Sequence, residues 1–224
     1  MLRKITCYGF SIALIVFLFL EAVMVHCFNT NFYETEYAKL NVAEDVGCSF
    51  DDLMKATRVL LDYTSDKRED MVVTAVIDGA EREVFNERET THMVDVKALY
   101  LTAEAVRNIC VITVIVCYFL NYGQQGLLKD LCPIFNRVSL IFLVVIGGIA
   151  LYAAMDFNSF WINFHHVFFT KNDFWLLNPA TDLMIRFFPE QFFFDLVFRI
   201  VVTFFAGFVL LNGLCILYRK KARA

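Results

Sequence analysis

The chain has 224 residues, of which 58% are hydrophobic and 16% aromatic, and phenylalanine alone occurs 25 times. A soluble domain of this length has no interior large enough for that apolar load, so the composition indicates an integral membrane protein. The formal net charge of -4 divides into an acidic internal segment and basic chain ends. Because no basic patch is present, the sequence excludes nucleic acid as a partner.

Four apolar runs are long enough to cross a bilayer, which takes about 20 residues at ~1.5 Å rise each. Lipid cannot satisfy backbone polar groups, so each run is predicted to be a helix. The runs cover approximately 5–25, 105–122, 138–160 and 192–218. We expect an all-α membrane protein with four transmembrane helices and a small extracytoplasmic α+β cap.

Basic residues near the ends of these runs set the expected orientation, because Lys and Arg favour the cytoplasmic side. They all fall on one side if the chain crosses four times, so both termini are expected in the cytoplasm. The protein is then a multi-pass protein of the cell membrane. The basic residues are Arg3, Lys4, Lys129, Arg137, Arg219, Lys220, Lys221 and Arg223.

This orientation predicts the domain organisation. Residues 1–28 form the first transmembrane helix, and 29–104 form the extracytoplasmic cap. Three further transmembrane helices lie within 105–224, with an outer aromatic loop at 157–191. The first run ends without the small residues of a signal-peptide cleavage site, and we therefore interpret it as a membrane anchor.

The segment between the first two runs has the pattern of a small folded cap. Apolar residues recur at helical spacing between 50 and 61, and Ser49 with Asp52 three residues later suits a helix start. The β-prone run 71–77 meets an Asp-Gly pair at 78–79, which is a hairpin signal. We therefore expect one helix followed by a short hairpin.

The return strand of the hairpin is expected to carry Val84 and Phe85. Directly afterwards, Asn86 and Glu89 stand at the spacing of a capping box, in which two side chains bond each other's backbone N–H groups. No helix breaker follows before the second apolar run, so this helix is expected to continue into the membrane. The aromatic loop at 157–191 holds both tryptophans and is expected to lie along the outer membrane surface.

The four histidines of the chain are candidates for proton-transfer chemistry. His26 stands at the outer end of the first helix, where an interfacial position is a sufficient explanation. His92 lies on the helix that runs down from the cap, and His165 and His166 lie in the aromatic loop. His92 and at least one of that pair are expected to converge where the cap meets the membrane.

The neighbours of His92 on its helix include acidic residues. A carboxylate beside an imidazole fixes its tautomer and raises its basicity, which makes Asp95 and Glu89 candidates for that task. The alternative is a surface helix with alternating charges. Lys97 points away from the face of the helix that carries His92. On a helix that turns about 100° per residue, the residues within roughly 60° of His92 are Arg88, Glu89, Asp95 and Val96.

Other active-site chemistries have less support. Zinc needs three or four ligands, often with a short-spaced pair such as HExxH, and the sequence has no such motif. No GxSxG motif occurs, and nothing near Cys48 marks it as an activated thiol. We expect neither a metal nor a cofactor.

Two clusters of residues resemble the motifs of a known family, the lipoprotein intramolecular transacylases (Lit), which are bacterial integral membrane proteins. The resemblance covers the chain nearly end to end, and the expected topology matches as well. The first cluster is Phe85-Asn86-x-Arg88-Glu89-x-x-His92-Met93-x-Asp95-Val96-Lys97. The second comprises Phe164-His165-x-x-Phe168-Phe169, Trp175, Pro179-x-x-Asp182 and Pro189-x-x-Phe192-Phe193.

The resemblance implies a substrate and a pair of catalytic residues. The substrate is a diacylated lipoprotein whose N-terminal cysteine carries an S-diacylglyceryl group. The sn-2 acyl chain moves to the α-amino group of that cysteine, which gives a lyso-form lipoprotein. His92 and His165 match the catalytic pair, although His166 follows directly and is a possible substitute or assistant. The expected substrate-binding or supporting residues are Arg88, Glu89, Asp95, Lys97, His166, Trp175 and Asp182.

Histidine chemistry suits such a transfer. An α-amine has a pKa of about 7.7–8.0, and an imidazole with a pKa of about 6.5 is able to take a proton from it and return one to the leaving oxygen. We hypothesise that His92 is the base, oriented by Asp95 or Glu89, and that His165 serves the ester or leaving oxygen. The reverse assignment stays open. Because nucleophile and ester belong to one substrate, no acyl-enzyme is required.

Two other function classes remain as alternatives. A membrane lipid esterase or hydrolase would release free fatty acid or lose activity with chelators. A non-enzymatic accessory protein, whose cap binds a partner, would be insensitive to substitution of the histidines. The chain is expected to act as a monomer in contact with membrane lipid.

Overall fold

The computed structural model describes residues 2–222. Arg223, counted above among the basic residues of the C-terminal end, lies outside the described residues. The elements follow one another in the order α1 (Leu2–Cys27), α2 (Thr30–Leu40), α3 (Val42–Val46), α4 (Phe50–Thr64), β1 (Thr74–Ile77), β2 (Ala80–Glu83), α5 (Glu87–Leu120), α6 (Leu127–Met155), α7 (Phe157–Phe168), α8 (Met184–Phe187) and α9 (Glu190–Lys221).

The chain divides into two compact units. The spanning unit comprises Met1–Val25, Ala103–Met155 and Phe198–Ala224. The histidine unit comprises His26–Thr102 and Asp156–Val197, and it holds all four histidines.

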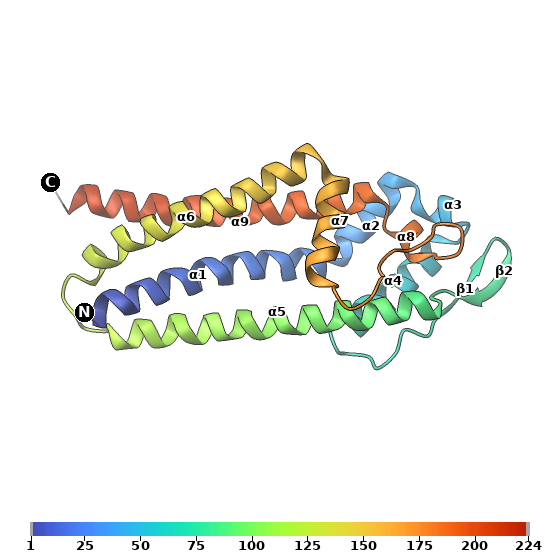
Figure 1. Cartoon of the computed structure of the whole chain (residues 1–224), viewed down its shortest axis with the longest axis horizontal. Helices are drawn as coiled ribbons and strands as arrows, with labels where there is room; N and C mark the ends of the chain where they lie inside the picture. The colour runs from blue at the N-terminus through green and yellow to red at the C-terminus, as the bar shows by residue number, and fades with distance from the viewer. Residues whose placement is uncertain (1, 223–224) are drawn as a thin grey trace. The chain divides into compact units, whose positions relative to one another are not determined.

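The spanning unit contains the apolar parts of α1, α5, α6 and α9, which are long and apolar enough to cross a membrane. These four segments run side by side in Figure 1, with the start of α1, the turn between α5 and α6, and the end of α9 at one end. Many of their apolar side chains are exposed, as expected for helices that face lipid. The prediction of four apolar helices is confirmed.

The third helix differs from its predicted range of 138–160. The helix α6 already begins at Leu127. The prediction missed this start because the first turn is charged and Pro133 follows it, so the segment does not read as an apolar run. It ends at Met155, where the carboxylate of Asp156 accepts a hydrogen bond from the backbone N–H of Ser159 and starts a separate helix, α7. A side-chain cap of this kind favours a new helix start over continuation of the previous helix.

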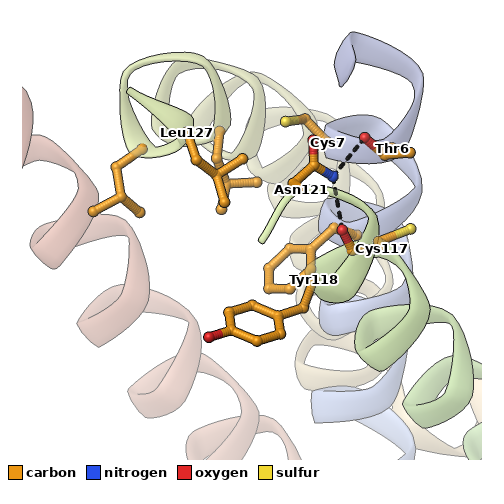
Figure 2. A pocket seen from close by; sticks show the side chains of 9 residues that line it. Thr6, Cys7, Cys117, Tyr118, Asn121 and Leu127 are labelled. Atoms are coloured by element: carbon orange, nitrogen blue, oxygen red, sulfur yellow. Dashed lines mark hydrogen bonds between the residues drawn. The ribbon is translucent and has the colours of Figure 1, made fainter. Parts of the chain in front are cut away.

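Polar side chains in the spanning unit pair with one another at the end where the helices start and finish. Arg3 forms an ion pair with Asp130 at 2.9 Å, and the Asn121 amide donates to the Thr6 hydroxyl at 2.8 Å. Thr6 and Asn121 line a largely apolar cavity of about 250 Å³ between α1, α5 and α6. Their side chains point toward one another in Figure 2. Thr6 and Asn121 are buried, and pairing satisfies polar groups that would be costly to leave without a hydrogen bond.

The histidine unit contains the predicted helix and hairpin. Ser49 caps α4 by accepting a hydrogen bond from the Asp52 backbone N–H at 3.0 Å. The strands β1 and β2 pair antiparallel, and Asp78 and Gly79 form the turn with positive φ angles of 52° and 81°. Because Asp and Gly tolerate positive φ, this pair fits a two-residue hairpin turn.

The prediction for the return strand was wrong by a few residues. Val84 and Phe85 follow β2 rather than forming part of it, although the Val84 N–H still donates to the Val73 carbonyl. Phe85 is buried against Phe187 of α8, with ring centroids 6.0 Å apart. Packing against a segment that is distant in sequence therefore ends the strand before these two apolar residues.

Two helices of this unit, α2 and α3, were not predicted. Asn29 caps α2, and α2 contributes Tyr33 and Tyr37 to an aromatic cluster with Phe188 and Phe192. Tyr37 also hydrogen-bonds Thr57 of α4 at 2.9 Å. The segment predicted as an aromatic loop contains α7 and the short helix α8 in addition to irregular chain.

Candidate active site

The first turns of α5 are fixed by the capping box. The Asn86 side-chain oxygen accepts from the Glu89 N–H at 3.0 Å, and a Glu89 carboxylate oxygen accepts from the Asn86 N–H at 2.8 Å. The other Glu89 oxygen accepts from the backbone N–H of Met184 in α8. The predicted capping box is confirmed, and Glu89 in addition joins α5 to α8. Burial raises the pKa of Glu89, and the hydrogen bonds from Met184 and Asn86 oppose that rise.

The helix α7 fixes the orientation of His165. One turn earlier, the Trp161 carbonyl lies 2.7 Å from the Nδ1 atom of His165. A carbonyl oxygen only accepts hydrogen bonds, so in the neutral ring Nδ1 carries the hydrogen and Nε2 keeps a free lone pair. The Trp161 ring also packs edge-on to His165, with centroids 5.0 Å apart. His165 is therefore held in the tautomer that is able to accept a proton at Nε2.

The two histidines converge within the histidine unit, as predicted from their places on the helix after the hairpin and in the aromatic segment. The ring centroids of His92 and His165 are 6.0 Å apart. His92 is 7% exposed and His165 is 9% exposed. Phe169 contacts both rings, at 5.1 Å from His92 and 5.4 Å from His165. On another side of His165, the indole of Trp175 stacks at 4.9 Å.

Burial keeps both imidazoles neutral near pH 7. The pKa of His92 is lowered to about 4, chiefly by burial and also by the nearby His165, while the charge of Asp95 opposes this with a smaller effect. Burial also lowers the pKa of His165, while the hydrogen bond to the Trp161 carbonyl raises it and the nearby His166 lowers it. An aromatic enclosure disfavours the charged form of each ring.

Neither candidate carboxylate hydrogen-bonds His92. Its buried Nδ1 atom has no hydrogen-bond partner within residues 2–222. Glu89 is occupied by Asn86 and Met184, and Asp95 accepts from the Asn172 amide at 2.8 Å. The expectation that Asp95 or Glu89 orients His92 through a hydrogen bond is therefore wrong. Asp95 influences His92 only through its charge.

Several predicted residues join α5 to the segment between α7 and α8. Arg88 donates to the Asp173 carbonyl and forms an ion pair with its carboxylate at 3.6 Å. The buried carboxylate of Asp182 accepts from the Asn86 amide at 2.8 Å and from the Asn178 N–H at 2.7 Å. Together with the pair between Asp95 and Asn172, these contacts hold the chain that carries Trp175.

Two predicted residues do not join the histidine pair. His166 is exposed and packs edge-on to Trp175, with centroids 5.0 Å apart, so His165 is the member of the adjacent pair that faces His92. Lys97 forms an ion pair with Asp66 at 2.6 Å and lies over the Tyr63 ring at 4.6 Å. These contacts place Lys97 against the last turn of α4 and the chain that follows it.

Three contributors to the site were missed. Trp161 lies four residues before His165, so helical spacing could have identified it as a partner once α7 was recognised. Phe169 belongs to the second motif cluster but was given no role in the site, and Asn172 carries no local signal, because their partners His92 and Asp95 come from a distant part of the chain. Within the described part of the chain, no cluster of three or more His, Cys, Asp or Glu residues is arranged to hold a metal ion.

Comparison with known proteins identifies the family. Residues 8–193 match the sequence model of the family described as lipoprotein intramolecular transacylase Lit. A search of curated protein sequences gave no match.

The fold matches solved structures of the membrane integral lipoprotein intramolecular transacylase Lit from Bacillus cereus. One of them is 21% identical and has a TM-score of 0.80, with 99% of this chain and 98% of that chain covered. A variant of that protein with a histidine-to-arginine substitution matches at 20% identity and a TM-score of 0.74, with 99% of this chain and 94% of that chain covered. A histidine-to-alanine variant gives the same identity and TM-score, with 99% and 96% covered. The chain is a multi-pass membrane protein that belongs to the Lit family of lipoprotein intramolecular transacylases.

Proposed function

We propose that this protein moves the sn-2 acyl chain of a lipoprotein's S-diacylglyceryl group to the α-amino group of the same N-terminal cysteine. The product is a lyso-form lipoprotein with one chain on nitrogen and one on glycerol. Family membership supports the class of reaction. The observation that carries the proposal is the pair of buried, neutral imidazoles whose rings lie 6.0 Å apart inside an aromatic enclosure.

The fixed tautomer of His165 assigns it the role of general base in this proposal. The amine nitrogen attacks the ester carbonyl carbon, and Nε2 of His165 takes the proton that the amine loses. The new nitrogen–carbon bond forms as the bond from carbon to the glycerol oxygen breaks, and the proton then passes to that oxygen. A positioned general base contributes about 10²–10⁴-fold to such a step. This is the reverse of the first assignment made from the sequence.

His92 takes the complementary role. Its lowered pKa keeps the ring neutral at pH 7. A neutral imidazole is a suitable hydrogen-bond partner for the ester group. Its buried Nδ1 atom has no hydrogen-bond partner within residues 2–222, so a substrate atom that reaches it would replace no existing hydrogen bond. A donor aimed at the oxyanion that develops in the transition state lowers the barrier by about 3–4 kcal/mol in comparable enzymes.

The aromatic surroundings support transfer over hydrolysis. Rings of Phe169, Trp161 and Trp175 pack against the two histidines and limit the access of water. Exclusion of water protects an ester that would otherwise be hydrolysed. Since one substrate supplies both the amine and the ester, positioning provides much of the rate enhancement, and no serine or cysteine nucleophile is needed.

The proposed orientation places the termini in the cytoplasm and the histidine unit outside. The basic residues Arg3, Lys4 and Lys129 stand at the ends of spanning helices, and Lys and Arg favour the cytoplasmic side. The substrate in this proposal is a lipoprotein held by its lipid in the outer leaflet. The chain is proposed to act as a monomer.

The test is expression of this chain in a bacterium that lacks lipoprotein N-acylation, followed by mass spectrometry of one N-terminal lipopeptide. Total mass does not change, so the fragment spectrum must locate each acyl chain. We expect one chain on nitrogen and one on glycerol. Loss of one acyl chain would instead indicate an esterase, and an unaltered diacylglyceryl cysteine with a free amine would indicate a non-enzymatic protein.

A further inference from the structure

A second site candidate lies in the spanning unit, apart from the histidines. A hollow of about 240 Å³ is bounded by α1 and the first turns of α6. Lys4 and Tyr8 line it from α1, and Lys129 and Arg137 line it from α6. It stands at the end of the unit where α1 and α6 begin (Figure 1).

The charge in this hollow is uncompensated and positive. Its one acidic residue, Asp130, is already paired with Arg3 at 2.9 Å. Lys4 and Lys129 are exposed, and neither has a hydrogen bond or ion pair in the described part of the chain. Arg137 donates only to the Tyr8 hydroxyl, at 3.3 Å. Three cations therefore remain for an anionic ligand.

An apolar path leads away from these cations along α6. Leu140, Ile141 and Val144 lie three, four and seven residues after Arg137, so all four share one face of the helix. The three apolar residues are 61%, 63% and 68% exposed. A ligand that fits both the cations of the hollow and this apolar face of α6 has an anionic head and long apolar chains.

The apolar cavity of Figure 2 is a different feature. Thr6 and Phe10 line it from α1, and each lies two residues from Lys4 or Tyr8, which is about 200° around the helix. Residues of that cavity carry no formal charge. It therefore offers nothing to a phosphate group and is not part of the basic hollow.

We propose that this hollow, lined by Lys4, Lys129 and Arg137, binds the phosphodiester head of an anionic phospholipid, whose acyl chains lie along the apolar face of α6. Basic pockets between transmembrane helices are suited to such head groups. The lipid would fix α1 against α6 at this end of the spanning unit. The site does not involve the histidines, and it stands or falls independently of the transacylase reaction.

The test uses two lipids with identical chains, dioleoylphosphatidylglycerol and dioleoylphosphatidylcholine. Each is titrated into the full-length protein in neutral detergent, and native mass spectrometry measures the bound fraction. We expect wild type to retain the anionic lipid preferentially. Replacing Lys4 and Lys129 together by Gln should weaken binding of the anionic lipid about 30-fold, at roughly one kcal/mol for each lysine.

The matched control is the double replacement Lys220→Gln with Lys221→Gln. It removes the same charge at the end of α9, and neither residue lines the hollow. It should leave the preference for the anionic lipid unchanged. Equal retention of both lipids by wild type would overturn the proposal, as would an equal loss in the control. If the Lys4 and Lys129 variant unfolds at a lower temperature without lipid, Arg137→Gln replaces it and must also weaken binding of the anionic lipid.

Discussion

At the scale of single residues, His165 and His166 are chemically identical neighbours in very different surroundings. His165 is buried, bonded to the Trp161 carbonyl and close to His92. His166 is exposed, and its ring contacts the edge of Trp175. Substituting each histidine in turn therefore separates the effect of losing the proposed base, His165, from the effect of losing a nearby imidazole, His166.

We expect His165→Ala to reduce the transfer rate by at least about 100-fold, because it removes the proposed base. His166→Ala should retain activity within a few-fold of wild type. The measurement is the rate of N-acylation of a diacylated lipopeptide by purified protein. Equal loss in both variants would contradict the assignment, and thermal unfolding of each variant confirms that it is folded.

The depressed pKa of His92 makes stability depend on pH. Its pKa is about 4 in the folded protein and about 6.5 when unfolded, so the unfolded chain binds more protons between those values. The stabilisation is fully present above about pH 6.5 and is lost as pH falls toward 4. A shift of this size corresponds to roughly 3 kcal/mol.

We therefore expect the thermal midpoint of wild type to fall more steeply between pH 7 and pH 4.5 than that of His92→Gln. Gln is uncharged at every pH and is similar to imidazole in polarity. A second variant, His92→Gln with His165→Gln, should be less sensitive still, because burial also lowers the pKa of His165. Parallel curves for all three proteins would show that neither ring is buried in its neutral form.

At the scale of elements, the start of α5 is held by one fully buried carboxylate. Glu89 accepts hydrogen bonds from Asn86 within its own capping box and from Met184 of α8. Removing it leaves the buried N–H of Met184 and the part-buried N–H of Asn86 without these partners. The same change would loosen the turn that carries His92.

We expect Glu89→Ala to lower the free energy of unfolding by about 2–4 kcal/mol, since each buried donor left without a partner costs about 1–3 kcal/mol. The control is Glu87→Ala, which removes an exposed carboxylate from the same first turn. Thermal unfolding in detergent compares the two. A loss in Glu87→Ala as large as in Glu89→Ala would mean that the charge of the helix start matters and the buried bonds do not.

Local patterns predicted the elements whose signals are local. The four apolar helices, the cap of α4 by Ser49, the turn at Asp78 and Gly79, and the capping box of α5 all depend on residues close in sequence. The short helices α2, α3 and α8 were missed, because their apolar residues meet partners from other elements. The start of α6 was hidden by its charged first turn.

The candidate site shows the same limit. Motif resemblance selected His92 and His165, and their rings do converge. The expected interaction of a carboxylate with His92 does not form, because the Glu89 carboxylate accepts a hydrogen bond from the Met184 N–H, 95 residues away in sequence. The Asp95 carboxylate likewise accepts a hydrogen bond from the Asn172 amide. Helical spacing showed which residues share a face, but the pairings of those residues are decided by long-range packing.

At the scale of the whole molecule, the chain combines apolar helices long enough to cross a membrane with a unit that holds two neutral histidines. The proposed reaction joins an amine and an ester of one substrate molecule. An intramolecular transfer has a signature that neither an esterase nor an intermolecular acyltransferase shares, because the acyl chain never leaves its own peptide.

The most direct test is a crossover experiment with purified protein. It is given equal amounts of two synthetic diacylated lipopeptides, one with deuterated acyl chains on an unlabelled peptide and one with unlabelled chains on a ¹³C-labelled peptide. Mass spectrometry then determines which chain is on each α-amine. We predict that deuterated chains appear only on unlabelled peptide and unlabelled chains only on ¹³C-labelled peptide. Mixed products, or free fatty acid in place of N-acylated peptide, would contradict intramolecular transfer.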